Sequence, residues 1–169
     1  MIQDSGTRRE FPGGAVRDMA DGIGKGRCDL LPLDVVCELM KREPEDEFAG
    51  VYLHIHHWQI TGDAVYLLEA LALFAKLRAW DPETMILELA KHFEEGATKY
   101  GERNWQKGIP TWSFTDSAIR HYAKWTRGDE DERHDRAFCW NLVCAIWTAY
   151  HRPDLHTYHE GIEIAEGEG

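Results

Sequence analysis

Apolar residues recur along most of the chain at the three- and four-residue spacing of a helix. The apolar positions from Leu33 to Met40 follow this spacing and predict a short first helix. Residues 48–60 carry both strand and helix signals, and we favour a helix because the chain offers no clear strand partner. The next segment, 63–80, is apolar around most of its circumference, which indicates a helix buried near the centre of the protein.

Capping residues mark where the predicted helices begin and end. The predicted starts are Asp63, Asp81 with Pro82, the Ser113–Asp116 capping box, and the acidic run that follows Gly128. The predicted ends are Gly101, Gly128 and the neighbourhood of His151, before Pro153. These signals predict an all-α protein, a compact bundle of about five helices with short connections. We expect a flexible arm over 1–28, a single domain over 29–153 and a tail over 154–169.

The composition is that of a folded chain with a strong acidic excess. The 169 residues are 43% hydrophobic and 29% charged, and the formal net charge is -11. This charge disfavours a nucleic-acid polymer as partner, because the phosphate backbone would be repelled. The sequence shows neither a bilayer-spanning apolar run nor a signal-peptide-like start, so we expect no membrane partner and a cytoplasmic location. The four cysteines are not closely paired and are expected to be reduced thiols.

One predicted helix carries acidic and imidazole groups on a single face. Glu88, His92 and Glu95 follow one another at helical spacing, and Glu94 lies beside them. Carboxylates on facing helices are how helical bundles hold hard divalent cations. The alternative is a solvated surface stripe, because lysines are interspersed with these carboxylates.

Two further helices place polar residues among apolar ones. His134 and Asp135 open the last helix, and Asn141 interrupts its apolar run. Because a buried amide needs a hydrogen-bond partner, Asn141 is either a core residue bonded within the protein or a contact to a ligand. On the preceding helix, Asp116 and Arg120 form either a simple ion pair or the polar lining of a cleft.

Cations, an amide and an aromatic ring gather between two of the predicted helices. Lys99, Arg103, Asn104 and Trp105 lie at a helix end and in the loop that follows. Cations are expected there for the helix dipole alone. The same set would also serve a nucleotide, because cations bind phosphates and an aromatic face stacks on a base.

The runs Gly24–Asp34, Ile86–Pro110 and Asp116–Thr148 together resemble the dATP/dGTP diphosphohydrolase family of phage and prophage origin. That family is akin to the MazG-like all-α nucleotide pyrophosphohydrolases. The run HFEEGATKYGERNWQKGIP is the most specific part of the likeness. The resemblance implies hydrolysis of a purine deoxynucleoside triphosphate to the monophosphate and pyrophosphate, Mg²⁺ or Mn²⁺ held by carboxylates, and a homo-oligomer.

The resemblance also implies site residues, although the sequence departs from the MazG pattern. Glu94 and Glu95 match the first acidic pair, but the ExxE spacing is absent, and Asn141 stands where a carboxylate is usual. The expected catalytic residues are Glu94, Glu95 and His134. The expected metal ligands are Glu94, Glu95, Asp116 and Asp135. The expected substrate contacts are Lys99, Arg103, Asn104, Trp105, Arg120, His121 and Asn141.

Two other functions remain open from the residues. The adjacent His134 and Asp135, with His92 or His121 before them and Asp154 after them, allow an HD-type deoxynucleotide phosphohydrolase. Such a site would release triphosphate or phosphate instead of pyrophosphate. The incomplete carboxylate motif equally allows a non-catalytic module that binds a nucleotide for regulation.

Overall fold

The computed structural model describes residues 8–18, 31–32 and 47–156, and these residues are mainly helical. The elements are β1 (Arg8–Glu10), β2 (Val16–Asp18), α2 (Glu47–Thr61), α3 (Val65–Leu77), α4 (Pro82–Tyr100), η2 (Asn104–Lys107), α5 (Thr111–Arg127), α6 (His134–His151) and η3 (Pro153–Leu155). The expected all-α bundle is therefore confirmed. The helix expected between Leu33 and Met40 lies outside the described residues. No helix in the described ranges combines the length and the apolar character needed to cross a bilayer.

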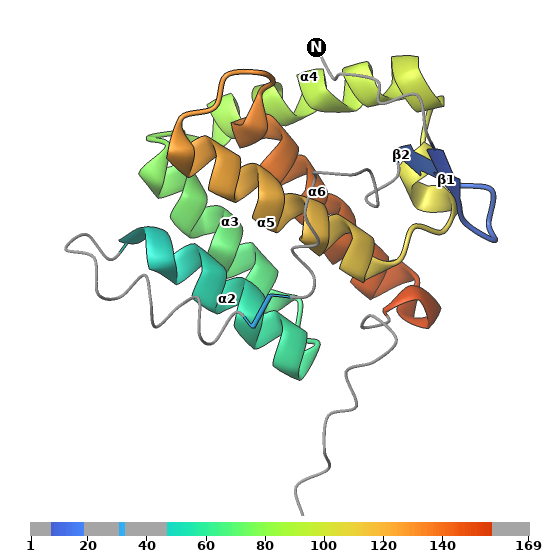
Figure 1. Ribbon diagram of the computed structural model, residues 1–169, viewed down its shortest axis with the longest axis horizontal. Helices are drawn as coiled ribbons and strands as arrows, with labels where there is room; N and C mark the ends of the chain where they lie inside the picture. Colours follow the sequence, from blue (N-terminus) through green and yellow to red (C-terminus); the bar gives the residue numbers. More distant parts are fainter. Residues whose placement is uncertain (1–7, 19–30, 33–46, 157–169) are drawn as a thin grey trace, which may run out of the picture.

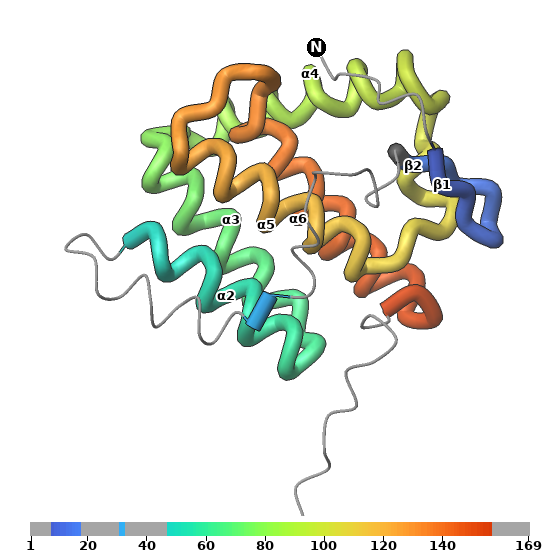
Figure 2. Tube along the Cα trace, viewed as in Figure 1, coloured from blue at the N-terminus to red at the C-terminus, as the bar shows by residue number. Residues whose placement is uncertain are grey.

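The helices are arranged as two antiparallel pairs with a fifth helix across one end of the bundle. α5 packs along α6, and α2 packs along α3 (Figure 1). α4 packs mainly against α6, and its C-terminal end reaches the small hairpin formed by β1 and β2. The chain path in Figure 2 shows α5 and α6 running in opposite directions at the centre of the molecule. Polar side chains on α5 and α6 are consequently brought face to face.

Two of the predicted helix boundaries are confirmed by their capping geometry. The side chain of Asp81 accepts a hydrogen bond from the backbone N–H of Thr84 at 2.7 Å, so α4 begins where predicted. α4 ends at Tyr100, and Gly101 follows with a φ of 89°, a conformation that favours glycine. Local signals were sufficient at these positions because both caps are formed by neighbouring residues.

Other predicted boundaries need correction. The capping box expected at Ser113 is absent, because α5 begins at Thr111 after Pro110, whose fixed φ suits a helix start. The acidic run after Gly128 is not helical, and α6 begins at His134. Asp63 accepts a hydrogen bond from the backbone N–H of Val65, but the helix that follows ends at Leu77, before the expected end.

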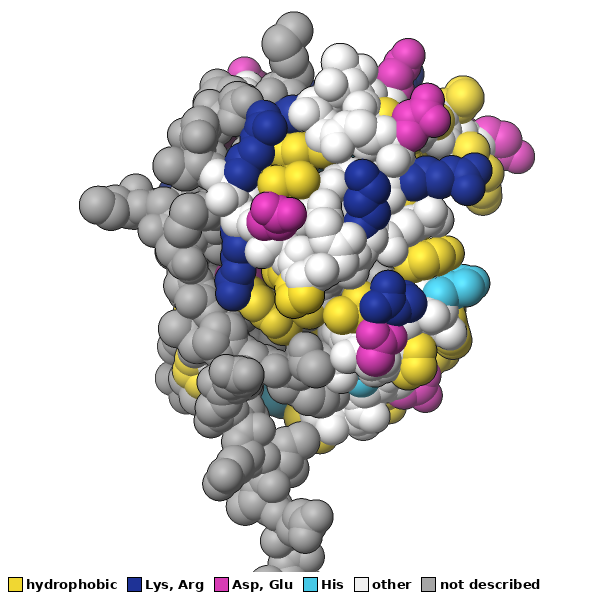
Figure 3. Space-filling model, turned by 90° about the vertical axis from the view of Figure 1, so that its right-hand side faces the viewer, with side chains coloured by type: hydrophobic (Ala, Val, Ile, Leu, Met, Phe, Trp, Pro, Cys, Tyr) yellow, Lys and Arg dark blue, Asp and Glu magenta, His cyan; other side chains and the backbone are white. Residues whose placement is uncertain are grey.

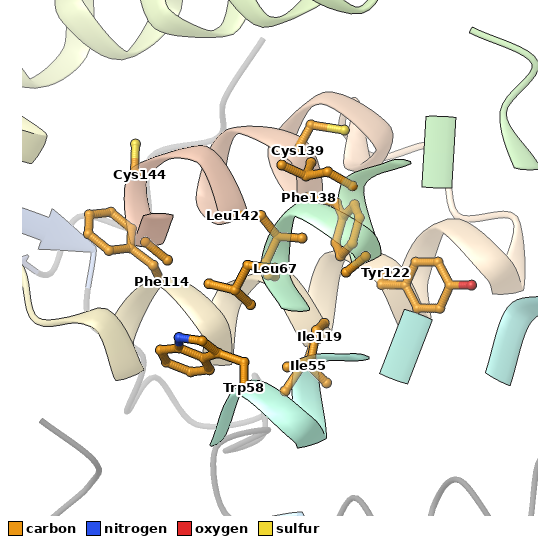
Figure 4. Close-up of a cluster of buried hydrophobic side chains, with 14 of the residues drawn as sticks. Ile55, Trp58, Leu67, Phe114, Ile119, Tyr122, Phe138, Cys139, Leu142 and Cys144 are labelled. Carbon is orange, nitrogen blue, oxygen red and sulfur yellow. The ribbon is translucent and has the colours of Figure 1, made fainter. Parts of the chain in front are cut away.

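Side chains from four helices meet in one apolar core. Ile55 of α2, Leu67 of α3, Ile119 of α5 and Leu142 of α6 are almost fully buried and lie close together in Figure 4. Phe74 of α3 contributes a ring that is within 4.6–6.2 Å of the rings of four neighbours. These are Trp80, Tyr122, Trp125 and Phe138. The core therefore ties α3 to the α5–α6 pair.

Two cysteines belong to the same interior. Cys139 and Cys144 of α6 are buried free thiols, and burial raises the pKa of both. Protonated, inaccessible thiols are unreactive, as expected for structural cysteines. Cys28 and Cys37 lie outside the described residues.

A β-hairpin forms within the segment that the sequence predicted to be a flexible arm. β1 and β2 pair in antiparallel fashion, with Arg9 opposite Arg17. Phe11 and Ala15 of the connecting turn are buried in the core. Gly13 approaches the backbone so closely that a Cβ atom there would lie 1.8 Å from the carbonyl oxygen of Lys107. The hairpin is therefore held to the loop before α5 by packing that only glycine permits.

Replacing Phe74 with alanine should lower the free energy of unfolding by about 3–5 kcal/mol, because it removes a buried ring from the centre of the core. The matched control is Leu87→Ala on α4, where the side chain is 63% exposed. That change should alter the stability by no more than about 0.5 kcal/mol. Urea denaturation followed by circular dichroism measures both, and equal effects would contradict the central role of Phe74.

Candidate functional site

Two imidazoles and a carboxylate meet where α5 packs against the start of α6. The Nδ1 atoms of His121 and His134 lie 3.0 Å apart. Oε1 of Glu132 lies 3.2 Å from the first of these nitrogens and 3.4 Å from the second. We call His121, Glu132 and His134 the histidine cluster. His134 is almost fully buried, whereas His121 and Glu132 are partly accessible.

Asp131 determines which nitrogen of His134 carries the proton. Its Oδ1 atom lies 2.7 Å from Nε2 of His134, which favours a proton on that nitrogen and a lone pair on Nδ1. Hydrogen bonds from Lys124 and His134 lower the pKa of Asp131 to about 2, so this carboxylate stays charged. The lone pair of His134 therefore points toward His121 and Glu132.

His121 is neutral at pH 7 in this environment. Burial, reinforced by His134 and Arg120, lowers the pKa of His121 well below its ordinary value of 6.5. A neutral His121 supplies at most one proton to the space shared by Glu132 and the lone pair of His134. An excess of electron pairs at one point, with few protons, is the arrangement that binds a cation.

The donor set of the histidine cluster suits some metals better than others. The ligand atoms of its three residues lie within 4.8 Å of one another, as a metal site requires. A second group shares His134 and adds Asp129 and Asp131. Imidazole nitrogens bind first-row divalent metals, Zn²⁺ and Fe²⁺ more tightly than Mn²⁺, whereas Mg²⁺ is held by oxygen ligands. Of the two ions expected from the sequence, Mn²⁺ fits these residues better.

A second polar cluster lies further along the same helices, and we call it the arginine cluster. It consists of Arg17, Asp116, Arg120 and Asn141. Arg120 donates a hydrogen bond to Asp116, which is 1% exposed. Arg17 donates from Nη2 to the side-chain oxygen of Asn141 at 2.5 Å, and the amide nitrogen of Asn141 donates to the carbonyl of Ala137. Asn141 is thus hydrogen-bonded within the core.

Arginine side chains form ion pairs with most of the carboxylates where α4 packs against α6. Arg136 donates to Glu88 at 2.5 Å and lies 3.7 Å from Glu95. Arg133 contacts Asp135 at 2.9 Å, and Arg78 reaches the same carboxylate at 3.1 Å. Although burial opposes it, the hydrogen bond from Arg133 lowers the pKa of Asp135. These ion pairs hold α4 and the end of α3 against α6.

The four carboxylates predicted as metal ligands do not come together in the described part of the chain. Glu94 is exposed, Glu95 lies near Arg136, Asp116 pairs with Arg120, and Asp135 pairs with arginines. None of them belongs to either group of potential ligands found among the described residues. His134, predicted to be catalytic, and His121, predicted to contact substrate, do belong to such a group.

The residues predicted to contact substrate fall into two sets. Arg120, His121 and Asn141 lie inside the two polar clusters. The other four lie near the hairpin: Lys99, Arg103, Asn104 and Trp105. Asn104 accepts from the backbone N–H of Val16 at 3.1 Å and donates to its carbonyl at 2.7 Å, so it anchors the hairpin. Trp105 packs against the rings of Phe93 and Trp147.

Sequence reasoning missed Glu132 and Arg17. Glu132 belongs to the acidic run interpreted as a complement to the helix dipole. Its position two residues before His134, with His121 on the preceding helix, was the available signal. Arg17 gave no signal, because it meets Asn141 across 124 positions of the chain.

Stability should fall in acid because His92 is buried in its neutral form. Burial lowers its pKa from 6.5 to about 4, so the unfolded chain binds a proton that the folded chain excludes between these pH values. The free energy of unfolding should therefore drop by about 3 kcal/mol as the pH falls through this window from 6.5 to about 4.

His92→Phe should flatten this part of the stability curve, whereas His151→Gln, at an exposed position, should not. Urea denaturation at a series of pH values measures the slopes. An unchanged slope in His92→Phe would rule out His92 as the source.

Comparison with known proteins identifies the family of the chain. A family model described as dATP/dGTP diphosphohydrolase, N-terminal, matches residues 54–157. This span includes α3 to α6 and therefore the whole histidine cluster. No curated protein and no solved structure gives a significant match. Because the match covers more than half of its residues, the chain belongs to the dATP/dGTP diphosphohydrolase N-terminal family.

Proposed function

We propose that the protein hydrolyses purine deoxynucleoside triphosphates to the monophosphate and pyrophosphate, with a divalent cation held by His121, Glu132 and His134. The observation that carries this proposal is the histidine cluster, in which three potential ligands converge within 4.8 Å inside the family-matched region. Family membership supports dATP and dGTP as the substrates.

The reaction adds one water across the bond between the α-phosphorus and the oxygen that bridges it to the β-phosphorus. The water oxygen bonds to the α-phosphorus, and pyrophosphate leaves with the bridging oxygen. A bound divalent cation would lower the pKa of a coordinated water and neutralise phosphate charge.

The residues of the chain prepare this chemistry. Asp131 keeps the proton on Nε2 of His134, so that Nδ1 is free to act as a ligand. The low pKa of His121 keeps its ring neutral, which a ligand requires. Lys124 neutralises Asp131, to which it donates at 3.0 Å.

One observation favours the HD-type alternative. His134 and Asp135 are adjacent, and His121 meets His134 as an upstream histidine of that motif would. The position of Asp135 argues against it, because this carboxylate contacts Arg78 and Arg133 and is absent from both ligand groups of the described residues. The pyrophosphohydrolase is therefore the better-supported function.

Product analysis with dGTP or dATP and Mn²⁺ tests the reaction. We expect the deoxynucleoside monophosphate and pyrophosphate in equal amounts, separated by ion-exchange chromatography. Triphosphate with free deoxynucleoside would contradict the proposal and support the HD-type reaction. Binding without any turnover would instead support the regulatory module.

Variants of the histidine cluster test the metal ligands. Asp131→Asn should weaken Mn²⁺ binding roughly 10- to 100-fold, because it removes the carboxylate that orients His134. His134→Gln should weaken Mn²⁺ binding more than Asp131→Asn does, because it removes a ligand.

Glu94→Gln is the matched comparison, since it removes the carboxylate that the sequence favoured as a ligand. We expect near wild-type turnover and Mn²⁺ binding in this variant because Glu94 is exposed and lies outside both ligand groups of the described residues. Calorimetric Mn²⁺ titration and initial rates measure both. Loss of Mn²⁺ binding in Glu94→Gln, with Mn²⁺ binding retained in His134→Gln, would show that the metal binds at α4 instead.

A further inference from the structure

Arg17 is a half-buried cation without a hydrogen-bonded carboxylate among the described residues. Its guanidinium lies over the rings of Phe114 at 5.1 Å and Trp140 at 6.0 Å, and its Nη2 atom donates to the neutral amide of Asn141. Asp116, the carboxylate of the arginine cluster, receives its hydrogen bond from Arg120. The charge of Arg17 is therefore held by aromatic faces and an amide.

Three polar atoms around Trp140 have no hydrogen-bond partner within the protein. They are Nη1 of Arg17, Nε1 of Trp140 and Nδ1 of His92, and all three are buried. The ring of His92 lies 5.6 Å from that of Trp140. Buried polar atoms are normally paired, so these three atoms, whose residues share Trp140 as a neighbour or are Trp140 itself, call for partners from outside the chain. Arginine and tryptophan side chains only donate, so such a partner must offer acceptor oxygens.

The partner should also carry negative charge. Burial lowers the pKa of Arg17 to about 10, so the guanidinium remains charged at neutral pH. His92, with its pKa near 4, is neutral and able to carry its proton on Nδ1. The charge of Asp116 raises the pKa of Arg17, but Asp116 is hydrogen-bonded to Arg120, so no carboxylate of the described residues is hydrogen-bonded to Arg17. An anion with several oxygens would balance the charge and accept from these donors.

The hairpin holds Arg17 in a fixed place. Asn104 makes two hydrogen bonds to the backbone of Val16, the residue directly before Arg17. Phe114, which Arg17 covers, precedes His121 on α5 by seven residues, or about 10 Å along the helix axis.

The outer surface at this end of the molecule is compatible with an anionic ligand. Lys and Arg side chains recur over the face that carries the hairpin (Figure 3). Arg8 of β1 is exposed there, as are Arg103 and Lys107 of the nearby loop. Local positive charge of this kind would attract an anion despite the net charge of -11.

We propose that Arg17, with Trp140 and His92, forms a phosphate-binding site, and that the N-terminal hairpin is the element that supplies its cation. Arg17 lies outside residues 54–157, so membership of the family does not assign this role. The identification of the ligand as a nucleotide rests on the proposed function, whereas the binding of phosphate oxygens does not. The hairpin thereby becomes part of the functional site.

Inorganic pyrophosphate, titrated calorimetrically without metal and in the presence of a chelator, tests this site. Wild-type protein should bind it, and Arg17→Met should bind it about 10- to 100-fold more weakly, the loss expected for charged hydrogen bonds. Arg9→Met is the matched control, because Arg9 pairs with Arg17 across the hairpin but is exposed. This variant should bind as the wild type does.

Several outcomes would overturn the proposal. They are absence of pyrophosphate binding to the wild type, wild-type affinity in Arg17→Met, and equal losses in the Arg9 and Arg17 variants. Deoxyguanosine is titrated in parallel, and Arg17-dependent binding of this phosphate-free nucleoside would also overturn it. If circular dichroism shows that Arg17→Met is unfolded, Arg17→Lys replaces it. Wild-type affinity in that variant would contradict a site in which Nη1 of Arg17 binds the anion while Nη2 is held by Asn141.

This test separates the two proposals. Arg17-dependent pyrophosphate binding without hydrolysis of dGTP or dATP would support the phosphate site and contradict the proposed function. Hydrolysis by the wild type, with wild-type pyrophosphate affinity and KM in Arg17→Met, would support the proposed function and contradict the phosphate site.

Discussion

Polar groups buried between α5 and α6 need partners inside the interface, and this requirement fixes how the two helices pack against each other. His121 and His134 meet at 3.0 Å in the part of the interface where Glu132 and Asp131 provide the neighbouring oxygens. Burying such groups is costly unless they are paired, so the two helices must keep one register along their length. The apolar core around Phe74 supplies the stability that lets this polar interface exist.

The clusters of charged and polar side chains differ in which groups are paired. Arginines neutralise Asp135, Glu88 and Glu95 at the junction of α4 and α6, and these pairs join the helices. The histidine cluster lacks such arginine pairs and keeps its electron pairs available for a cation. In the arginine cluster, Nη1 of Arg17 has no hydrogen-bond partner, and no carboxylate of the described residues is hydrogen-bonded to this cation. We propose that a metal-bound phosphate compound binds at both clusters.

The candidate site could be predicted from the sequence only in part. His134 was expected to be catalytic and His121 to contact substrate, and the structure brings both to one point. The acidic pair Glu94 and Glu95 was equally conspicuous, but α4 presents Glu94 to solvent. Helical spacing shows which residues share a face, and it does not show whether that face meets another helix or water.

The sequence by itself determined the all-α class, the family and those helix ends that are set by neighbouring residues, such as the Asp81 cap and the stop at Gly101. These features follow from interactions that act over a few positions. Only the tertiary structure decided which carboxylates face arginines and which face imidazoles. It also formed the hairpin and placed Arg17 against Asn141, 124 positions away. Such contacts depend on how whole helices pack, because packing brings together side chains that no local pattern connects.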